Sequence, residues 1–187
     1  MIVYQLHIAL KRISPRIWRR FQVNADMSLH DLHKVIQTVM GWDNEHLHQF
    51  AKGKTLYYAS PEDPPLKEKI SELLKNEKDK ISYEYDFGDG WDHTIKLEKI
   101  ITVDKKLKHP VCLTGKRNCP IEDCGGPGGY ETFLEKLKNQ EISDDVDDDD
   151  EDEDEWGFPT DFDPEDFDLE RINGYLKVDD YGCFDMF

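Results

Sequence analysis

Alternating apolar and polar residues define most of the elements that this chain is expected to form. Apolar side chains recur at every second position in residues 2–10 and again in 17–23, which predicts an N-terminal β-hairpin. After Ser28 the apolar spacing becomes helical, with Ser28 as the N-cap and Gly41 ending the helix. Further strands are predicted at 55–58, 100–103 and 111–114, and further helices at 66–76 and 130–137.

Residues 81–98 give the clearest pattern, two strands of period two joined by a glycine-rich turn. A two-residue turn would put the apolar side chains of the two strands on opposite faces, so we predict a three-residue loop at 88–90. This register places Phe87 on the apolar face and sets Asp86 directly opposite Asp92 on the other face. Like charges in that position are destabilising, so a compensating group is expected.

Composition divides the chain into two parts of different character. Of the net charge of -17, residues 141–187 contribute 21 acidic and 2 basic side chains, whereas 1–140 hold 20 acidic and 22 basic ones. The run 144–155 has a single uncharged residue and is predicted to be disordered, either as a solubilising insertion or as a contact for a basic protein. We therefore expect a core domain at 1–140, an acidic insertion at 141–155 and a C-terminal segment at 156–187 whose helix docks on the core.

The expected fold class is α+β, a single domain whose mostly antiparallel sheet is built from hairpins and covered by a few helices. No apolar run approaches the roughly 18 residues of a membrane span, and no leader precedes the first strand, which favours a cytoplasmic protein without membrane contact. In that compartment Cys112, Cys119 and Cys124 would be free thiols or thiolate ligands. Their spacing differs from the paired CxxC knuckles of structural zinc sites.

Several histidines and acids are candidate ligands for a divalent metal. Period two places His46 and His48 on one face of a predicted strand, a spacing that can bind one ion. Further ligands would have to come from His93, from His30 or His33, or from the hairpin acids Asp86, Asp89 and Asp92. The favoured alternative is that the histidines are packed neutral side chains and the acids face water, so no cofactor is predicted.

A basic patch is predicted on the second strand. Arg16, Trp18 and Arg20 share one face, and Arg19 lies beside them. Basic residues interleaved with an aromatic ring can bind a nucleic acid. The favoured alternative is that these arginines pack along Trp18 and pair with carboxylates, because residues 1–140 lack the basic excess that phosphate binding requires.

The run of glycines and proline at 125–129 precedes a predicted helix. It matches neither GxxxxGK[ST] nor GxGxxG, so phosphate binding is not supported, and a tight crossing of two chain segments is the better interpretation. Near the C-terminus, Asp163 as N-cap and Pro164 as the first helical residue predict a final helix that docks Phe167 and Ile172 on the core.

Five motifs follow one another along the chain: IWRRF, MGWDNEHLHQF, YEYDFGDGWDHTIKLE, GKRNCPIEDCGGPGGYETFLE and FDPEDFDLERIN. In this order they resemble the plasmid pRiA4b ORF-3-like family over residues 1–140 and roughly 156–176. The resemblance implies an α+β fold, and the family is sometimes labelled a mobile-element passenger or resolvase-like. A serine recombinase needs a nucleophilic serine among arginines, and Ser14 reads instead as a turn residue before proline.

The resulting functional expectation is a non-enzymatic binding or interaction module. A protein, or plasmid or mobile-element DNA, is its candidate partner. The alternative is a metal-dependent hydrolase or nuclease-like enzyme that uses the histidine and aspartate cluster.

Overall fold

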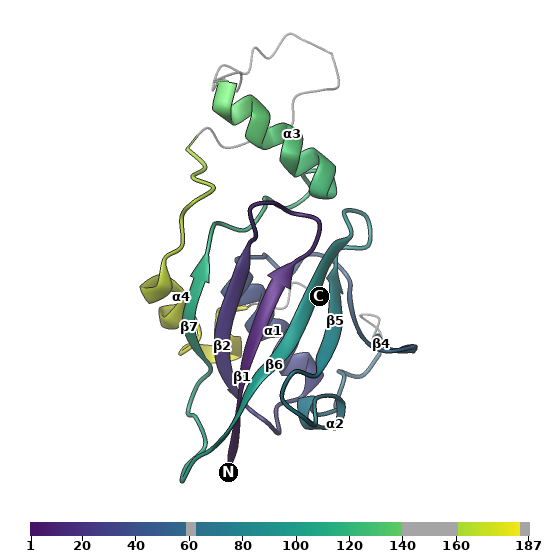
Figure 1. Ribbon diagram of the computed structural model, residues 1–187, viewed down its shortest axis with the longest axis vertical. Coiled ribbons are helices and arrows are strands. Elements are labelled where there is room, and N and C mark those ends of the chain that lie inside the picture. Colours follow the sequence, from purple (N-terminus) through teal and green to yellow (C-terminus); the bar gives the residue numbers. More distant parts are fainter. Residues whose placement is uncertain (59–62, 140–160, 184–187) are drawn as a thin grey trace.

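The computed structural model describes residues 1–58, 63–139 and 161–183 as an antiparallel sheet of seven strands with helices packed against it (Figure 1). The sheet order is β4-β3-β5-β6-β1-β2-β7. The strands are β1 Ile2–Leu10, β2 Trp18–Asn24, β3 His48–Lys52, β4 Thr55–Tyr58, β5 Lys80–Tyr85, β6 Trp91–Thr102 and β7 Val111–Lys116. The helices are α1 Leu29–Met40, α2 Ile70–Leu73, α3 Gly126–Asn139 and α4 Leu169–Tyr175, with a short 3-10 turn η1 at Asp179–Gly182. The predicted single α+β domain is confirmed.

Helix α1 begins and ends at the predicted residues. The Ser28 side chain accepts a hydrogen bond from the Asp31 amide at 3.0 Å and donates one to the Asp31 carboxylate at 2.6 Å. Gly41 ends the helix with φ 101°, a left-handed conformation that favours glycine. The apolar stripe of α1 packs on one face of the sheet, which Figure 1 shows from the opposite side, with α1 behind the strands.

Strand alternation determines which side chains reach the core between the sheet and α1. In β1, Leu6, Ile8 and Leu10 are buried on the α1 side, while His7 and Ala9 point to the other face. The same alternation continues across the neighbouring strands, so one face of the sheet is apolar and covered and the other is polar. We call the polar side the open face. Within the described residues, none of the helices has the length and apolar character that crossing a membrane requires.

The predicted register of the central hairpin is wrong by two residues. Tyr85 pairs with Trp91, Tyr83 with His93 and Glu84 with Asp92, so Asp86 is not opposite Asp92. The loop therefore spans 86–90 and is closed by a hydrogen bond of 2.7 Å from the Gly90 amide to the Asp86 carbonyl. A shift of two residues keeps the predicted apolar residues of both strands on the covered face.

The loop itself explains the shift. Asp86 adopts φ 55°, and its Oδ1 accepts hydrogen bonds from the amides of Gly88 and Asp89 at 2.9 and 3.3 Å. This side-chain turn ends the strand at Tyr85 and leaves Phe87 exposed rather than on the apolar face, beside Tyr58 with ring centroids 6.0 Å apart.

Two predicted helices have different bounds in the structure. The helix expected at 66–76 is a single turn at 70–73, and the final helix starts at Leu169 with Asp168, not Asp163, as its N-cap. Asp163 instead accepts a hydrogen bond from the Glu165 amide in a local turn. Ile172 is buried, and Phe167 lies over Arg19, as the predicted docking requires. The acidic insertion expected at 141–155 lies outside the described residues.

The run of glycines and proline at 125–129, which includes the first turn of α3, makes the predicted tight crossing. A Cβ at Gly126 would collide with the backbone carbonyl of Asp89 in the hairpin loop, and one at Gly129 would overlap the carbonyl of Cys124. Helix α3 then extends away from the end of the sheet (Figure 1). Glycine is needed here because two backbones lie too close for any side chain.

Candidate metal centre

Three loops that are distant in the sequence meet beside the end of β5. His46 comes from the segment between α1 and β3, Asp86 follows β5, and Glu122 and Asp123 lie between β7 and α3. The ligand atoms of His46, Asp86 and Asp123 all lie within 4.8 Å of one another. We call the side chains of His46, Asp86, Glu122 and Asp123 the His46 cluster.

His46 Nε2 lies close to a carboxylate oxygen of each of the other three side chains, and with Asp86 and Asp123 it shares the mutual spacing of ligands around one ion. His46 Nε2 lies 3.3 Å from Asp123 Oδ1, 3.4 Å from Glu122 Oε2 and 3.8 Å from Asp86 Oδ2. A tetrahedral ion with bonds near 2.0–2.1 Å separates its ligands by about 3.3 Å. Among the described residues, His46 Nε2 and Glu122 Oε2 are buried atoms with no hydrogen-bond partner. Buried polar atoms in native structures nearly always have one.

Glu122 is held in place through one of its two oxygens. Oε1 accepts hydrogen bonds from the Asp43 amide at 2.8 Å and from the Tyr85 hydroxyl at 3.0 Å. Burial, reinforced by the nearby Glu122 carboxylate, raises the pKa of Tyr85, so its hydroxyl keeps the proton that it donates. Oε2 is thereby directed toward His46.

Asp86 is positioned in the same way. Its Oδ1 accepts the two loop amides, and its own amide donates to the Leu47 carbonyl at 2.9 Å, one residue from His46. Its Oδ2 faces the imidazole. Each of these two carboxylates therefore has one oxygen bound by the protein and one directed into the cluster, the pattern by which outer hydrogen bonds orient metal ligands.

The His46 cluster is buried on one side and open on the other. The side chains of Asp86 and Glu122 are 8% and 14% exposed, whereas that of Asp123 is 61% exposed. Burial raises the pKa of Glu122, because its negative charge is removed from water. A divalent cation would offset this cost, and its solvent side could carry a water molecule.

Comparison with known proteins places this fold in a family. The sequence profile of the plasmid pRiA4b ORF-3-like proteins matches residues 2–171. The chain belongs to the plasmid pRiA4b ORF-3-like family. It is 32% identical over 186 residues to the uncharacterized protein y4hQ of Sinorhizobium fredii, covering 95% of this chain and 91% of the relative. The crystal structure of MM3350, a protein of unknown function from Methanosarcina mazei, shares 37% identity and a TM-score of 0.71, over 90% of this chain and 96% of the other.

The His46 cluster of this ORF-3-like protein contains only part of the predicted metal set. His46 and Asp86 meet, but His46 precedes β3 rather than sharing a strand face with His48. His48 instead stacks on His33 with ring centroids 3.5 Å apart. His93 is fully buried beneath the sheet, and burial lowers its pKa to about 3. Asp92 lies on the open face, 3.8 Å from Lys11.

His33 belongs to a hydrogen-bonded network in the core. Its Nδ1 lies 2.8 Å from the Tyr83 hydroxyl, which also accepts from Gln37 Nε2 at 2.8 Å, and its Nε2 lies 2.6 Å from Asn44 Oδ1. One proton arrangement satisfies all of these groups: Gln37 donates to Tyr83, Tyr83 donates to His33, and His33 donates to Asn44. His33 is therefore a neutral structural residue, and burial keeps its pKa well below the usual value.

The three candidate thiolates are buried and protonated. Burial raises the pKa of Cys112 to about 11 and that of Cys124 to about 12, and it raises that of Cys119 well above its usual value. Among the residues that the structure covers, the only group with metal-ligand spacing is His46 with Asp86 and Asp123, and it contains no cysteine. A thiolate site would also require deprotonation that this environment opposes.

The predicted basic patch is divided between the two faces of the sheet. Arg19 is buried on the α1 side, where its guanidinium donates to the carbonyls of Val39 and Lys116 at 2.7 and 2.9 Å. Arg20 lies on the open face, binds both oxygens of Glu98 at 2.6 and 2.9 Å, and covers the ring of Trp18. Arg19 therefore stabilises the core and is not a surface contact, and only Arg16, Trp18 and Arg20 remain on the surface side.

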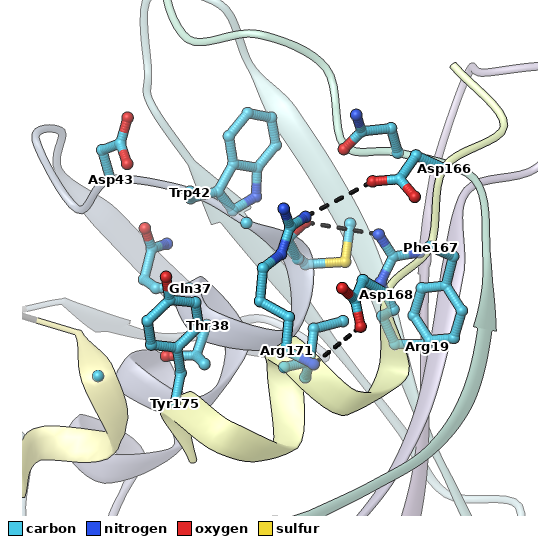
Figure 2. Close-up of a pocket in the computed structure, with 15 residues that line it drawn as sticks. Arg19, Gln37, Thr38, Trp42, Asp43, Asp166, Phe167, Asp168, Arg171 and Tyr175 are labelled. Atoms are coloured by element: carbon cyan, nitrogen blue, oxygen red, sulfur yellow. Dashed lines mark hydrogen bonds and ion pairs between the residues drawn. The ribbon is translucent and has the colours of Figure 1, made fainter. Parts of the chain in front are cut away.

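A separate cavity of about 400 Å³ lies between α1, α4 and the loop after β7. Figure 2 shows Arg171 extending from α4 toward Trp42, with an ion pair of 3.6 Å to Asp166. Tyr175 and Phe167 line it on either side. Its wall includes Asp43, whose amide binds Glu122, so the cavity borders the His46 cluster. The cavity lies at the interface between α4 and the core.

Sequence reasoning did not select Glu122 or Asp123. Both stand next to the glycine run in the motif PIEDCGGPGGY, and that run was the available signal. Glycines that permit a close approach of two backbones also bring the side chains beside them close to the other segment, here the hairpin loop that ends at Gly90.

Proposed function

We propose that this protein binds a divalent metal ion through His46, Asp86, Glu122 and Asp123. One observation supports this above the others. Glu122 and Asp86 each have one oxygen fixed by hydrogen bonds and the other directed at His46 Nε2, which within the described residues has no hydrogen-bond partner. An imidazole with several carboxylates suits Zn²⁺ or Mn²⁺.

A protonated His46 surrounded by carboxylates is the simplest competing explanation. The imidazole would then be expected to donate a hydrogen bond, yet no described acceptor satisfies the geometry at Nε2 despite three oxygens within 3.8 Å. An ion bound by both the nitrogen and the oxygens would hold them at these distances without a direct hydrogen bond between them.

Metal titration of the full-length protein tests the proposal. Protein stripped with a chelator should bind one equivalent of Zn²⁺ or Mn²⁺ in calorimetry, and an ion at about 100 times its Kd should stabilise the fold by about 2.7 kcal/mol. His46→Gln and Glu122→Gln should each weaken binding at least about 10-fold, since even outer-shell changes do so. Asp92→Asn is the matched control, because Asp92 is an acid of the same hairpin on the open face. Absence of stoichiometric binding, or equal loss in Asp92→Asn, would overturn the proposal.

The open side of the cluster supports a hydrolytic use of the ion over a purely structural one. Catalytic metal sites keep a position for water beside their protein ligands, so an ion held by all four of these side chains would carry water only as a fifth ligand. Asp123 is mostly exposed and forms that open side. Metal-dependent cleavage of bis(p-nitrophenyl) phosphate that is lost in Glu122→Gln would assign hydrolysis. Stoichiometric binding without turnover would assign a binding role.

A further inference from the structure

Four nitrogen-bearing side chains form a row across the open face of the sheet. Lys80 of β5 pairs with Lys96 of β6, Lys96 pairs with His7 of β1, and His7 pairs with Arg20 of β2. Like charges directly opposite each other on neighbouring strands destabilise a sheet. Arg20 is neutralised by Glu98, but no ion pair within the described residues involves Lys80 or Lys96. The row therefore has an unbalanced positive charge.

Three members of the row, His7, Lys80 and Lys96, line a groove. A cavity of about 710 Å³ lies over them and is bounded by the turn between β1 and β2. Five cationic side chains line it: Lys11, Arg12, Arg16, Lys80 and Lys96. Its lining carboxylate, Glu98, is already bound by Arg20 through both oxygens. We call this feature the basic groove.

The cations of the groove are available to a ligand. Lys11 and Arg12 lie 3.8 and 3.9 Å from Asp92, with side chains 39% and 57% exposed, and such loose surface pairs contribute little. Arg12 also donates one hydrogen bond from Nη2 to the Gly90 carbonyl at 2.6 Å. Arg16 and Lys80 are exposed. The basic groove therefore concentrates positive charge on a chain whose net charge is -17.

We propose that the basic groove binds the phosphodiester backbone of a nucleic acid. The three adjacent strands that line the groove span about 10 Å at their usual spacing, which exceeds one phosphate group and matches about three nucleotides at 3.4 Å each. A backbone with regularly repeated charge can therefore reach all three strands. A flat anionic membrane would not enter a recessed groove. The proposal uses none of the His46 cluster and is independent of the metal site.

The expected salt dependence follows from the number of cations. If all five contact phosphates of a single strand, the logarithm of the binding constant falls with that of the salt concentration with a slope of about -3.5. Affinity then decreases about 100-fold between roughly 50 and 200 mM salt. Removing two cations should reduce the slope to about -2.1 and weaken binding about 25-fold at roughly 0.1 M salt.

Fluorescence anisotropy with the full-length protein and a labelled oligonucleotide, single-stranded and as a duplex, tests this. The variant is Lys80→Gln with Lys96→Gln, and the matched control is Lys67→Gln with Lys138→Gln, which removes the same charge from exposed positions outside the groove. Saturable binding that falls about 25-fold in the variant and stays within about 2-fold of wild type in the control supports the proposal.

Three results would overturn it. The first is no binding of either oligonucleotide below about 10⁻⁴ M at roughly 50 mM salt. The second is an equal loss in variant and control, because binding would then reflect overall charge. The third is binding to phosphatidylserine vesicles or to poly-aspartate at the affinity of the oligonucleotide, which would assign the groove to a membrane or to an acidic protein.

Discussion

Mild acid should destabilise this protein through three histidines that are neutral in the folded state. Burial is the largest cause in each case: it lowers the pKa of His48 to about 4, that of His93 to about 3 and that of His33 well below its usual value. In the unfolded chain each has a pKa near 6.5. Below that value the unfolded state binds protons that the folded state does not, so stability is lost as the pH falls from about 6.5 toward the folded-state values.

The magnitude follows from the difference in bound protons. At about pH 5.5 each of these histidines reduces the free energy of unfolding by about 1.4 kcal/mol relative to about pH 7.5, which gives about 4 kcal/mol for three. Glu98, whose pKa its hydrogen bond to Arg20 lowers to about 2, acts only below about pH 4.5. The loss is large beside a typical total of about 5–15 kcal/mol.

His93→Leu isolates one of the three contributions. His93 lies in the core against Tyr83, and within the described residues neither ring nitrogen makes a hydrogen bond of good geometry, although the backbones of Trp91 and Tyr83 interact weakly with the ring. Leucine is similar in size and cannot titrate, so the variant should be at least as stable at about pH 7.5 and should lose about 3 rather than about 4 kcal/mol on acidification. Urea unfolding followed by tryptophan fluorescence at both pH values measures this. Equal losses in the two proteins would show that His93 is not buried as a neutral group.

Three further outcomes are expected. Tyr83→Phe leaves two bonding partners on α1 unsatisfied and should cost about 2–4 kcal/mol in urea unfolding, whereas Tyr58→Phe at an exposed position should change stability by less than about 0.5 kcal/mol. Gly129→Ala would overlap a backbone carbonyl and should cost at least about 3 kcal/mol, whereas Gly128→Ala in the same helix has free space and should stabilise by up to about 1 kcal/mol. Burial lowers the pKa of His7, so a bound oligonucleotide should raise it in an NMR titration and bind more tightly at lower pH. The charged groups around His7 are Glu98, which raises the pKa, and Arg20, Lys96 and Arg16, which lower it.

The parts of the fold that local signals determine were predictable from the sequence. The alternation in residues 2–10 and 55–58 gave the bounds of β1 and β4, and the caps at Ser28 and Gly41 gave those of α1. The final helix was placed too early because Asp163 and Pro164 form a local turn with the same residue types as a helix start. Period two, caps and glycines act over a few residues, so they define elements and faces.

The hairpin register shows where local reasoning fails. A shift by two residues moves Phe87 into the loop but leaves the side chains that stay in the strands on their predicted faces, so hydrophobic pattern alone cannot distinguish a three-residue from a five-residue loop. Asp86 decides between them, because its carboxylate accepts the following amides and ends the strand early. Aspartate followed by glycine two residues later was the sequence signal for such a turn.

The position of Asp86 depends on contacts from three other parts of the chain, and this is why the His46 cluster could be predicted only in part. The Asp86 amide is fixed by the carbonyl of Leu47, and Arg12 donates to the Gly90 carbonyl at 2.6 Å from the opposite side of the loop. Gly126 packs directly on the Asp89 carbonyl and brings Glu122 with it. None of these contacts leaves a periodic pattern in the sequence. The hairpin provides one carboxylate, but the His46 cluster forms only where the loops before β3 and α3 pack against it.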